Sequence, residues 1–186
     1  PIEGSYSMDP SVFKDDDGSY YMYLGGIWGG QLQRWDENGN YTEMGCETQD
    51  NGIPNSPAIS PRIAKMSDDM ISFAEELKPI RIVDNSGNPI LTKDYDRRFF
   101  EAAWIHKHNG TYYLSYSTGN THYIVYATGD NPYGPFVYQG ILNEPVQGWT
   151  NHHSTVKIDG KWYLFYHDVE MSGQSNLRNV KYTEFT

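Results

Sequence analysis

The stretch that decides the fold is Phe99–Gly119, which reads FFEAAWIHKHNGTYYLSYSTG. It contains two runs of apolar, aromatic and β-branched residues separated by the pair Asn109-Gly110. An Asn-Gly pair between two such runs predicts a β-hairpin, because the tight turn requires positive φ angles that these two residues adopt readily. We therefore expect two antiparallel strands here, with Glu101 at the start of the first.

Two further stretches repeat this pattern. One is Asp9–Leu24, with its turn at DDDG, and the other is His152–Tyr166, with its turn at IDG. When the three are aligned on their turn glycines, Asp9 and Glu101 each lie nine residues before the glycine, and His152 lies eight before it. If the repeats are arranged radially, these three side chains converge on one axis.

The rest of the chain also reads as β structure. No segment shows a sustained period of 3.6 residues, so we expect an all-β protein with at most a brief helical turn at Glu75–Leu77. Polar, Pro- and Asn-rich insertions are expected at 46–61 and 84–96. Additional strands are expected at 31–35, 41–44, 62–66, 72–73, 80–83, 123–127, 136–139 and 177–182.

Four-stranded antiparallel units of roughly 40–50 residues are typical of β-propeller blades. The long interval between Gly18 and Gly110 is read as one blade with an insertion, so the 186 residues hold about three blades. Propellers close with four to eight blades. An open set of blades exposes strand edges, which predicts either missing blades or self-association.

Composition narrows the class of partner. The net charge is −10, which argues against a nucleic acid or an anionic membrane and fits a neutral substrate. Aromatic residues make up 15% of the chain, and such rings suit both half-buried strands and stacking on sugars. No apolar run approaches 18 residues, so no membrane span is predicted. The single cysteine, Cys46, leaves cytoplasmic, periplasmic and secreted locations open.

The chemistry centres on Glu101, which lies among Phe99, Phe100 and Trp104. A carboxylate in apolar surroundings is costly, so its pKa should rise, and a neighbouring Asp9 carboxylate would raise it further. A carboxylic acid that stays protonated near neutral pH is what a glycosidic leaving group requires. Asp9 would remain ionised and tune this acid.

Each candidate also has a structural interpretation. Asp9 could be a turn residue before Pro10, His152 a hydrogen-bonded core histidine, and Arg178 a surface ion-pair partner rather than a substrate contact. The DDDG segment lacks the alternating ligands of a calcium loop and reads as a turn. His106 and His108 read as solvated turn residues.

At these residues the chain resembles the family 43 glycoside hydrolases. The matching segments are MDPSVF with DDDG, Phe99–Tyr116, Asn131–Phe136, and His152–His167 followed by Leu177-Arg178. The resemblance implies a five-bladed β-propeller of which about three blades are present. It also implies an inverting hydrolase that cleaves xylosides or arabinofuranosides in pentose-containing oligo- or polysaccharides.

The resemblance further implies a role for each site residue. Glu101 corresponds to the general acid and Asp9 to the residue that modulates its pKa. His152 lies at the central cavity, close to a structured water or to a calcium ion that it contacts through water, and no other cofactor is required. Arg178 corresponds to a substrate contact. Beside these carried-over roles, the aromatic residues Trp104 and Phe100 next to Glu101 are our own candidates for binding the sugar.

One expected residue has no counterpart. The general base of the family is an Asp in the first blade, and no aligned position of this sequence supplies it, so we expect the chain alone to be catalytically incomplete. Two alternatives stay open. One is a non-catalytic carbohydrate-binding or interaction module derived from such a propeller, and the other is a retaining propeller enzyme that cleaves fructosides.

Overall fold

The computed structural model describes residues 8–26, 55, 57–119, 121–148 and 151–186, and within these ranges every regular element is a strand. The all-β prediction is therefore confirmed for the described part, whereas the hairpin predicted at 31–44 lies outside it. No helix of the described ranges is long and apolar enough to cross a membrane. The strands are β1 (Ser11–Lys14), β2 (Tyr20–Leu24), β3 (Arg62–Lys65), β4 (Lys78–Pro79), β5 (Ile82–Val83), β6 (Glu101–His108), β7 (Thr111–Ser117), β8 (Ile124–Gly129), β9 (Phe136–Asn143), β10 (His153–Ile158), β11 (Lys161–Asp168) and β12 (Asn179–Phe185).

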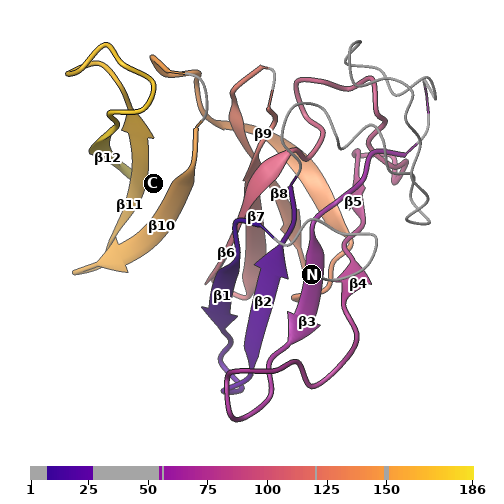
Figure 1. Cartoon of the computed structure of the whole chain (residues 1–186). Coiled ribbons are helices and arrows are strands. Elements are labelled where there is room, and N and C mark those ends of the chain that lie inside the picture. The colour runs from indigo at the N-terminus through magenta and orange to yellow at the C-terminus, as the bar shows by residue number, and fades with distance from the viewer. Residues whose placement is uncertain (1–7, 27–54, 56, 120, 149–150) are drawn as a thin grey trace.

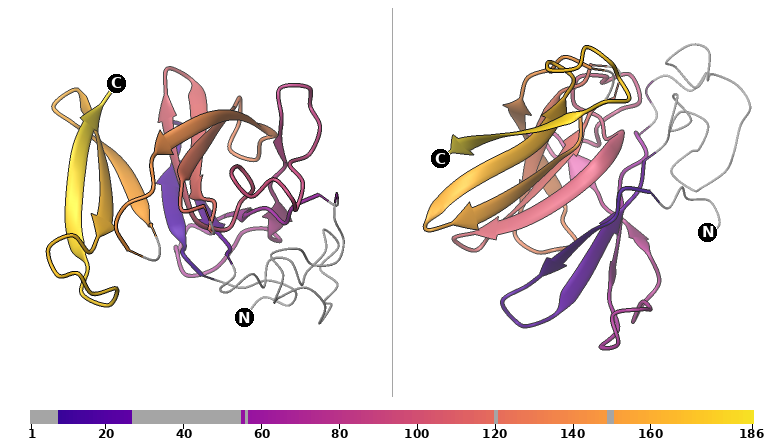
Figure 2. Two further views of the ribbon diagram at one scale, coloured as in Figure 1. Left: turned by 90° about the horizontal axis from the view of Figure 1, so that it is seen from above. Right: turned by 60° about the vertical axis from the view of Figure 1, so that its left-hand side comes forward.

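The strands form three separate sheets, and each sheet contains one of the three repeated hairpins (Figure 1). The first sheet has the order β1-β2-β3-β4, the second β5-β9-β8-β7-β6, and the third β10-β11-β12. All neighbours are antiparallel except β5, which pairs parallel with β9. Strand β6 contacts both β1 of the first sheet and β10 of the third, so the second sheet stands between the other two (Figure 2).

Turn chemistry explains why the hairpins form where the sequence predicts them. Asn109 and Gly110 have φ angles of 50° and 83°, and Asp159 and Gly160 have 49° and 84°. Two consecutive residues with positive φ give the tight turn whose twist matches that of the flanking strands. The register then follows from the turn, with His108 opposite Thr111 and Ile158 opposite Lys161.

The main hydrophobic core lies between the first and second sheets. Alternating side chains of β7 point into it, among them the fully buried Leu114 and Tyr116. From the first sheet, Tyr23 and Ile63 are also fully buried, and the Tyr23 hydroxyl donates a hydrogen bond to the Pro132 carbonyl at 2.8 Å. The turn that precedes β9 is therefore attached to the core of a different sheet.

The helical turn predicted at Glu75–Leu77 is wrong. The Glu75 carboxylate instead accepts hydrogen bonds from the Lys65 backbone N–H at 2.9 Å and the Tyr133 hydroxyl at 2.6 Å, and it pairs with Lys78 at 2.6 Å. These partners hold the segment as a bend between β3 and β4, so long-range contacts outweigh local helix preference. The strand predicted at 72–73 is reduced to a single bridge between Met66 and Phe73.

Candidate active site

A bulge at the start of β6 positions Glu101. In the β6–β7 ladder Glu101 lies opposite Ser117 and Trp104 lies opposite Ser115, with the register shifted between them, and Ala102 has a φ of 60°. The extra residue frees Glu101 from the alternation of the strand, as bulges commonly do beside active sites. Gly26 packs directly against it: a Cβ at position 26 would lie 2.8 Å from the Glu101 Cβ. Only a glycine leaves room for the carboxylate here.

Asp9 lies beside this bulge. Its Oδ2 accepts a hydrogen bond from the Ala102 backbone N–H at 3.1 Å, and its Oδ1 lies 3.9 Å from the His152 Nδ1. Asp9 precedes β1, Glu101 begins β6 and His152 precedes β10, so the contacts join three sheets. The structure therefore brings together the three residues that share one position in the sequence repeats.

The surroundings of Glu101 favour the protonated form of its carboxyl group. Its side chain is only 7% exposed. Burial raises the pKa of Glu101 to about 7, the Asp9 carboxylate acts in the same direction, and the Arg178 guanidinium opposes them. Loss of hydration disfavours the charged carboxylate, and a second carboxylate nearby disfavours it further. The site thus holds two neighbouring carboxyl groups, of which Glu101 is the buried one.

Arg178 belongs to the segment between β11 and β12, immediately before β12. Its Nε donates a hydrogen bond to the Ser175 carbonyl at 3.3 Å, and the residue is exposed. Its charge lowers the pKa of Glu101 and that of His167. The third sheet therefore reaches the acid electrostatically.

The two aromatic candidates, Trp104 and Phe100, are both fixed by contacts within the protein. The Trp104 indole N–H donates to the Thr155 Oγ1 at 3.0 Å, which links β6 to β10. Phe100 is 6% exposed, and a Cβ at Gly119 would lie 2.3 Å from its ring. Both rings are held by the protein itself, and their contact with a sugar stays a prediction.

The interpretation of His106 as a solvated turn residue is wrong. Its ring stacks on Tyr113 with centroids 4.9 Å apart and lies 4.6 Å from the ring of Trp162. Its Nδ1 lies 3.0 Å from the Thr155 Oγ1, and burial lowers the pKa of His106 to about 4. The side chain is therefore packed between the second and third sheets.

Sequence reasoning missed His153 and Ser115. His153 is 4% exposed, and its Nε2 lies 2.6 Å from the Oγ of Ser115, which is fully buried. Burial lowers the pKa of His153 to about 3. The doublet His152-His153 carried a signal, because neighbouring residues of an extended chain point to opposite sides and the two rings therefore have different surroundings.

The described residues do not form a direct calcium site. Within the ranges that the structure describes, no group of three or more His, Cys, Asp or Glu side chains could hold a metal ion. Calcium takes six to eight oxygen ligands, and the carboxylate near His152 is that of Asp9. A water-mediated contact from His152 to calcium stays a prediction.

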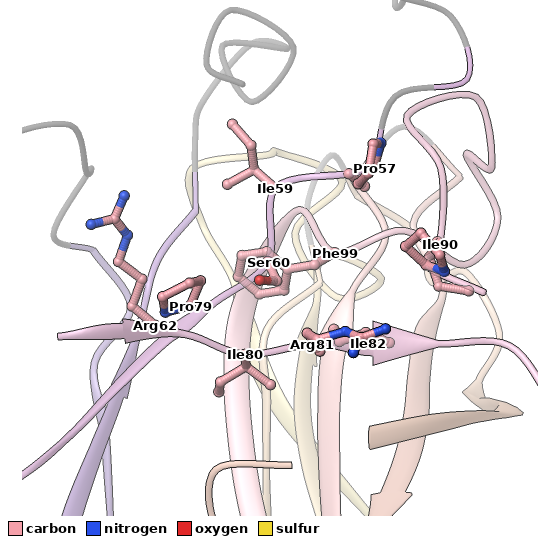
Figure 3. A pocket seen from close by; sticks show the side chains of 12 residues that line it. Pro57, Ile59, Ser60, Arg62, Pro79, Ile80, Arg81, Ile82, Ile90 and Phe99 are labelled. Carbon is pink, nitrogen blue, oxygen red and sulfur yellow. The ribbon is translucent and has the colours of Figure 1, made fainter. Parts of the chain in front are cut away.

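A cavity of about 360 Å³ lies apart from these residues. Figure 3 shows its walls, which are mostly proline and isoleucine side chains, with Arg62 and Arg81 among them. Phe99 lines it, but Asp9, Glu101 and His152 do not. The carboxyl group of Glu101 therefore lies outside this cavity. We define the candidate active site instead by Asp9, Glu101 and His152, which come from three different sheets.

Comparison with known proteins agrees with this geometry. The sequence profile of glycosyl hydrolases family 43 matches residues 1–184. A xylosidase/arabinosidase 43A of Humicola insolens is 56% identical over 99% of this chain and 57% of its own length. A xylosidase/arabinosidase of Bacteroides ovatus is 52% identical over 99% of this chain and 55% of its own length. The chain thus spans somewhat more than half of these relatives.

Solved structures give the same result. CoXyl43, a β-xylosidase/α-arabinofuranosidase from a compost metagenome determined in a calcium-free form with xylotriose, superimposes with a TM-score of 0.87. It is 66% identical, and the match covers all of this chain and 56% of that one. A GH43_1 enzyme of Xanthomonas citri with xylotriose gives a TM-score of 0.88 at 50% identity, again over all of this chain and 55% of its own. This chain belongs to glycosyl hydrolases family 43.

Proposed function

We propose that this chain is the acid-bearing part of an inverting glycoside hydrolase that acts on xylosides or arabinofuranosides of plant cell walls. The observation that carries the proposal is Glu101: a buried carboxyl with its pKa raised to about 7, beside Asp9. The names of the relatives support the substrate class, since they are xylosidases and arabinosidases, and two solved neighbours hold xylotriose.

In this mechanism Glu101 protonates the oxygen of the leaving group. Inversion also requires a base on the opposite face of the sugar, with the two carboxyl groups about 6.5–9.5 Å apart so that a water fits between them. Asp9 does not suit that task, because it is hydrogen-bonded to the residue that follows Glu101. Asp9 instead tunes the acid by its charge. The base then lies in the portion of the relatives that this chain does not span.

The remaining candidates bind the substrate. Arg178 is exposed at the site and offers a charged donor to sugar hydroxyls. His152 is half-exposed and presents its ring beside Asp9. Trp104 and Phe100 shape the apolar wall, and a calcium ion near the axis would be contacted by His152 only through water.

The complete catalytic unit is a five-bladed propeller in this proposal. The three described sheets supply about three blades, and the further blades close the ring against the open edges of the first and third sheets. Where those blades are lacking, the same edges favour self-association.

The test uses the complete natural protein that carries this chain, with Glu101→Gln and the exposed control Glu76→Gln. Loss of a general acid matters most when the leaving group is poor, and such acids contribute about 10²–10⁴ in rate. We expect Glu101→Gln to lower kcat/KM on xylobiose by about that factor, and far less on nitrophenyl β-xyloside. The measurement is initial-rate kinetics on both substrates, repeated with nitrophenyl α-L-arabinofuranoside.

Two results would count against the proposal. Equal losses on poor and activated leaving groups would remove Glu101 from the role of acid. Binding of xylotriose without turnover by the complete protein would favour a non-catalytic carbohydrate-binding module.

A further inference from the structure

The candidate site is assembled from three sheets, and the contact on the side of the third sheet is weak. His152 is 46% exposed, and its ring approaches Asp9 only to 3.9 Å. On the side of the first sheet, by contrast, Asp9 is fixed by a hydrogen bond to the backbone of β6. Another contact must therefore hold the beginning of β10 in place.

The adjacent residue supplies that contact. His153 begins β10, and its Nε2 and the Ser115 Oγ are 2.6 Å apart in a buried environment. Thr155, two residues further along, accepts the hydrogen bond from the Trp104 indole. Side chains two residues apart share one face of a strand, and Ser115 and Trp104 are opposite each other in the β6–β7 register. Two parallel hydrogen bonds thus fix the register of β10 against the second sheet.

The chemistry of the His153 ring indicates how it acts. Burial lowers the pKa of His153 to about 3, so its imidazole is neutral at the pH values where Glu101 titrates. Its Nδ1 has no hydrogen-bond partner within the described ranges, so Ser115 is the one described polar contact of this ring. A neutral ring held at one atom and buried away from solvent is suited to positioning rather than to proton transfer.

We propose that His153 is a positioning residue, whose hydrogen bond to Ser115 sets where His152 and the edge of the third sheet stand relative to Asp9 and Glu101. The inference rests on the proposed role of Glu101 as the acid. Without this hydrogen bond the start of β10 moves away from the second sheet and water reaches Glu101. Its pKa then falls toward the ordinary value, and the site loses alignment.

The experiment compares Ser115→Ala, His153→Phe and the double variant in the complete natural protein. We expect each single variant to lower kcat about tenfold or more with a smaller change in KM, because misplacement of reacting groups acts on the chemical step. The alkaline limb of the kcat/KM profile should move down by about one pH unit. The double variant should be no worse than either single one, since both remove the same bond. Ser115→Thr, which keeps the hydroxyl, should restore much of the loss.

The matched control is Tyr112→Phe, which removes a buried hydroxyl hydrogen bond at the opposite end of β7. It should lower stability and leave kcat, KM and the pH profile unchanged. If Ser115→Ala and His153→Phe behave like this control, the positioning role is overturned.

A second readout separates this inference from the proposed function. The Glu101 carboxyl can be titrated by ¹³C NMR in the parent and in Ser115→Ala. If the complete protein proves inactive on every xyloside and arabinofuranoside, the proposed function fails. The positioning role is supported if the titration midpoint of Glu101 is lower in Ser115→Ala than in the parent. It is refuted if that midpoint is unchanged.

Discussion

The polar contacts at the two interfaces of the second sheet are of opposite kinds. Beside the hydrophobic core, the interface with the first sheet contains a charged cluster centred on Asp15, and we call this cluster the charged interface. The Asp15 carboxylate pairs with the Lys107 ammonium at 2.7 Å and accepts a hydrogen bond from the Tyr112 hydroxyl at 2.5 Å, and Lys107 also pairs with Asp16 at 2.8 Å. Burial by itself raises the pKa of Asp15, but the hydrogen bonds from Lys107 and Tyr112 outweigh it and leave that pKa lowered.

The interface with the third sheet, which we call the neutral interface, contains stacked rings and uncharged hydrogen bonds. His106 lies between Tyr113 and Trp162, and Thr155 bridges His106 and Trp104. Burial lowers the pKa of His106 to about 4, and the nearby His108 acts in the same direction. The two interfaces should therefore lose stability at different pH values as the solution is acidified. The charged interface needs an ionised carboxylate, and the neutral interface needs an uncharged imidazole.

The largest expected effect comes from removing the ring at the centre of the neutral interface. Trp162→Ala should lower the free energy of unfolding by about 3 kcal/mol, because its indole packs on His106, His108 and Phe185. Urea unfolding measures the loss, and hydrogen exchange should place it in β10–β12. Tyr182→Ala, on the 67%-exposed side chain of the same sheet, is the control and should cost under about 1 kcal/mol. Equal losses would mean that the ring stack does not hold the third sheet.

The next effect is a pH dependence. Because the pKa of His106 is about 4 in the folded protein and about 6.5 in the unfolded chain, the unfolded state takes up the proton first as the pH falls. The stability that the neutral His106 ring contributes is present in full above about pH 6.5. It is lost progressively as the pH falls toward 4, and the free energy of unfolding is lower by about 2 kcal/mol at pH 5. The pKa of Asp15 is also lowered in the folded protein, so its contribution is lost in the same direction, but only as the pH falls below its ordinary value of 3.8.

The measurement compares urea unfolding at pH 7 and pH 5 for the parent protein and His106→Phe. The parent should lose more stability than the variant over this interval. If both lose the same amount, His106 is not responsible for the acid sensitivity of the neutral interface.

The smallest effect tests the charged interface. Tyr112→Phe removes one hydroxyl that donates to a carboxylate and should cost about 1.5 kcal/mol at pH 7. Tyr113→Phe is the adjacent control, because the Tyr113 ring stacks on His106 and its hydroxyl makes no hydrogen bond in the described ranges. Urea midpoints that rank the two variants in reverse order would contradict the assignment of the Asp15 network.

Local sequence signals predicted the hairpins and the three converging residues. The Asn109-Gly110 and Asp159-Gly160 pairs fix their turns by backbone preference alone, so the strands on both sides follow. The offsets of Asp9 and Glu101, nine residues each, and of His152, eight residues, from their turn glycines then follow from the repeat. These features depend on residues close together in the sequence.

The features that sequence reasoning missed depend on distant partners. The parallel pairing of β5 with β9 brings Ile82 opposite Phe136, and no local pattern encodes it. Glu75 is drawn into a bend by Tyr133, far along the chain. The hydrogen bond between Ser115 and His153 joins two sheets whose packing the sequence does not state.

The bulge after Glu101 also determines how the position of this carboxyl is coupled to the core. Side chains alternate between the two faces of a strand. Deleting one residue between Glu101 and Trp104 would therefore turn every side chain before the deletion to the opposite face. The inward-facing Ile105 and the rest of β6 would keep their places, while the carboxyl would turn to the other face. Phe99 lies before the bulge and is buried in the core, so the same deletion would turn its ring away from the core and would displace the backbone N–H that holds Asp9. The bulge therefore ties the position of Glu101 to the packing of the core and to Asp9.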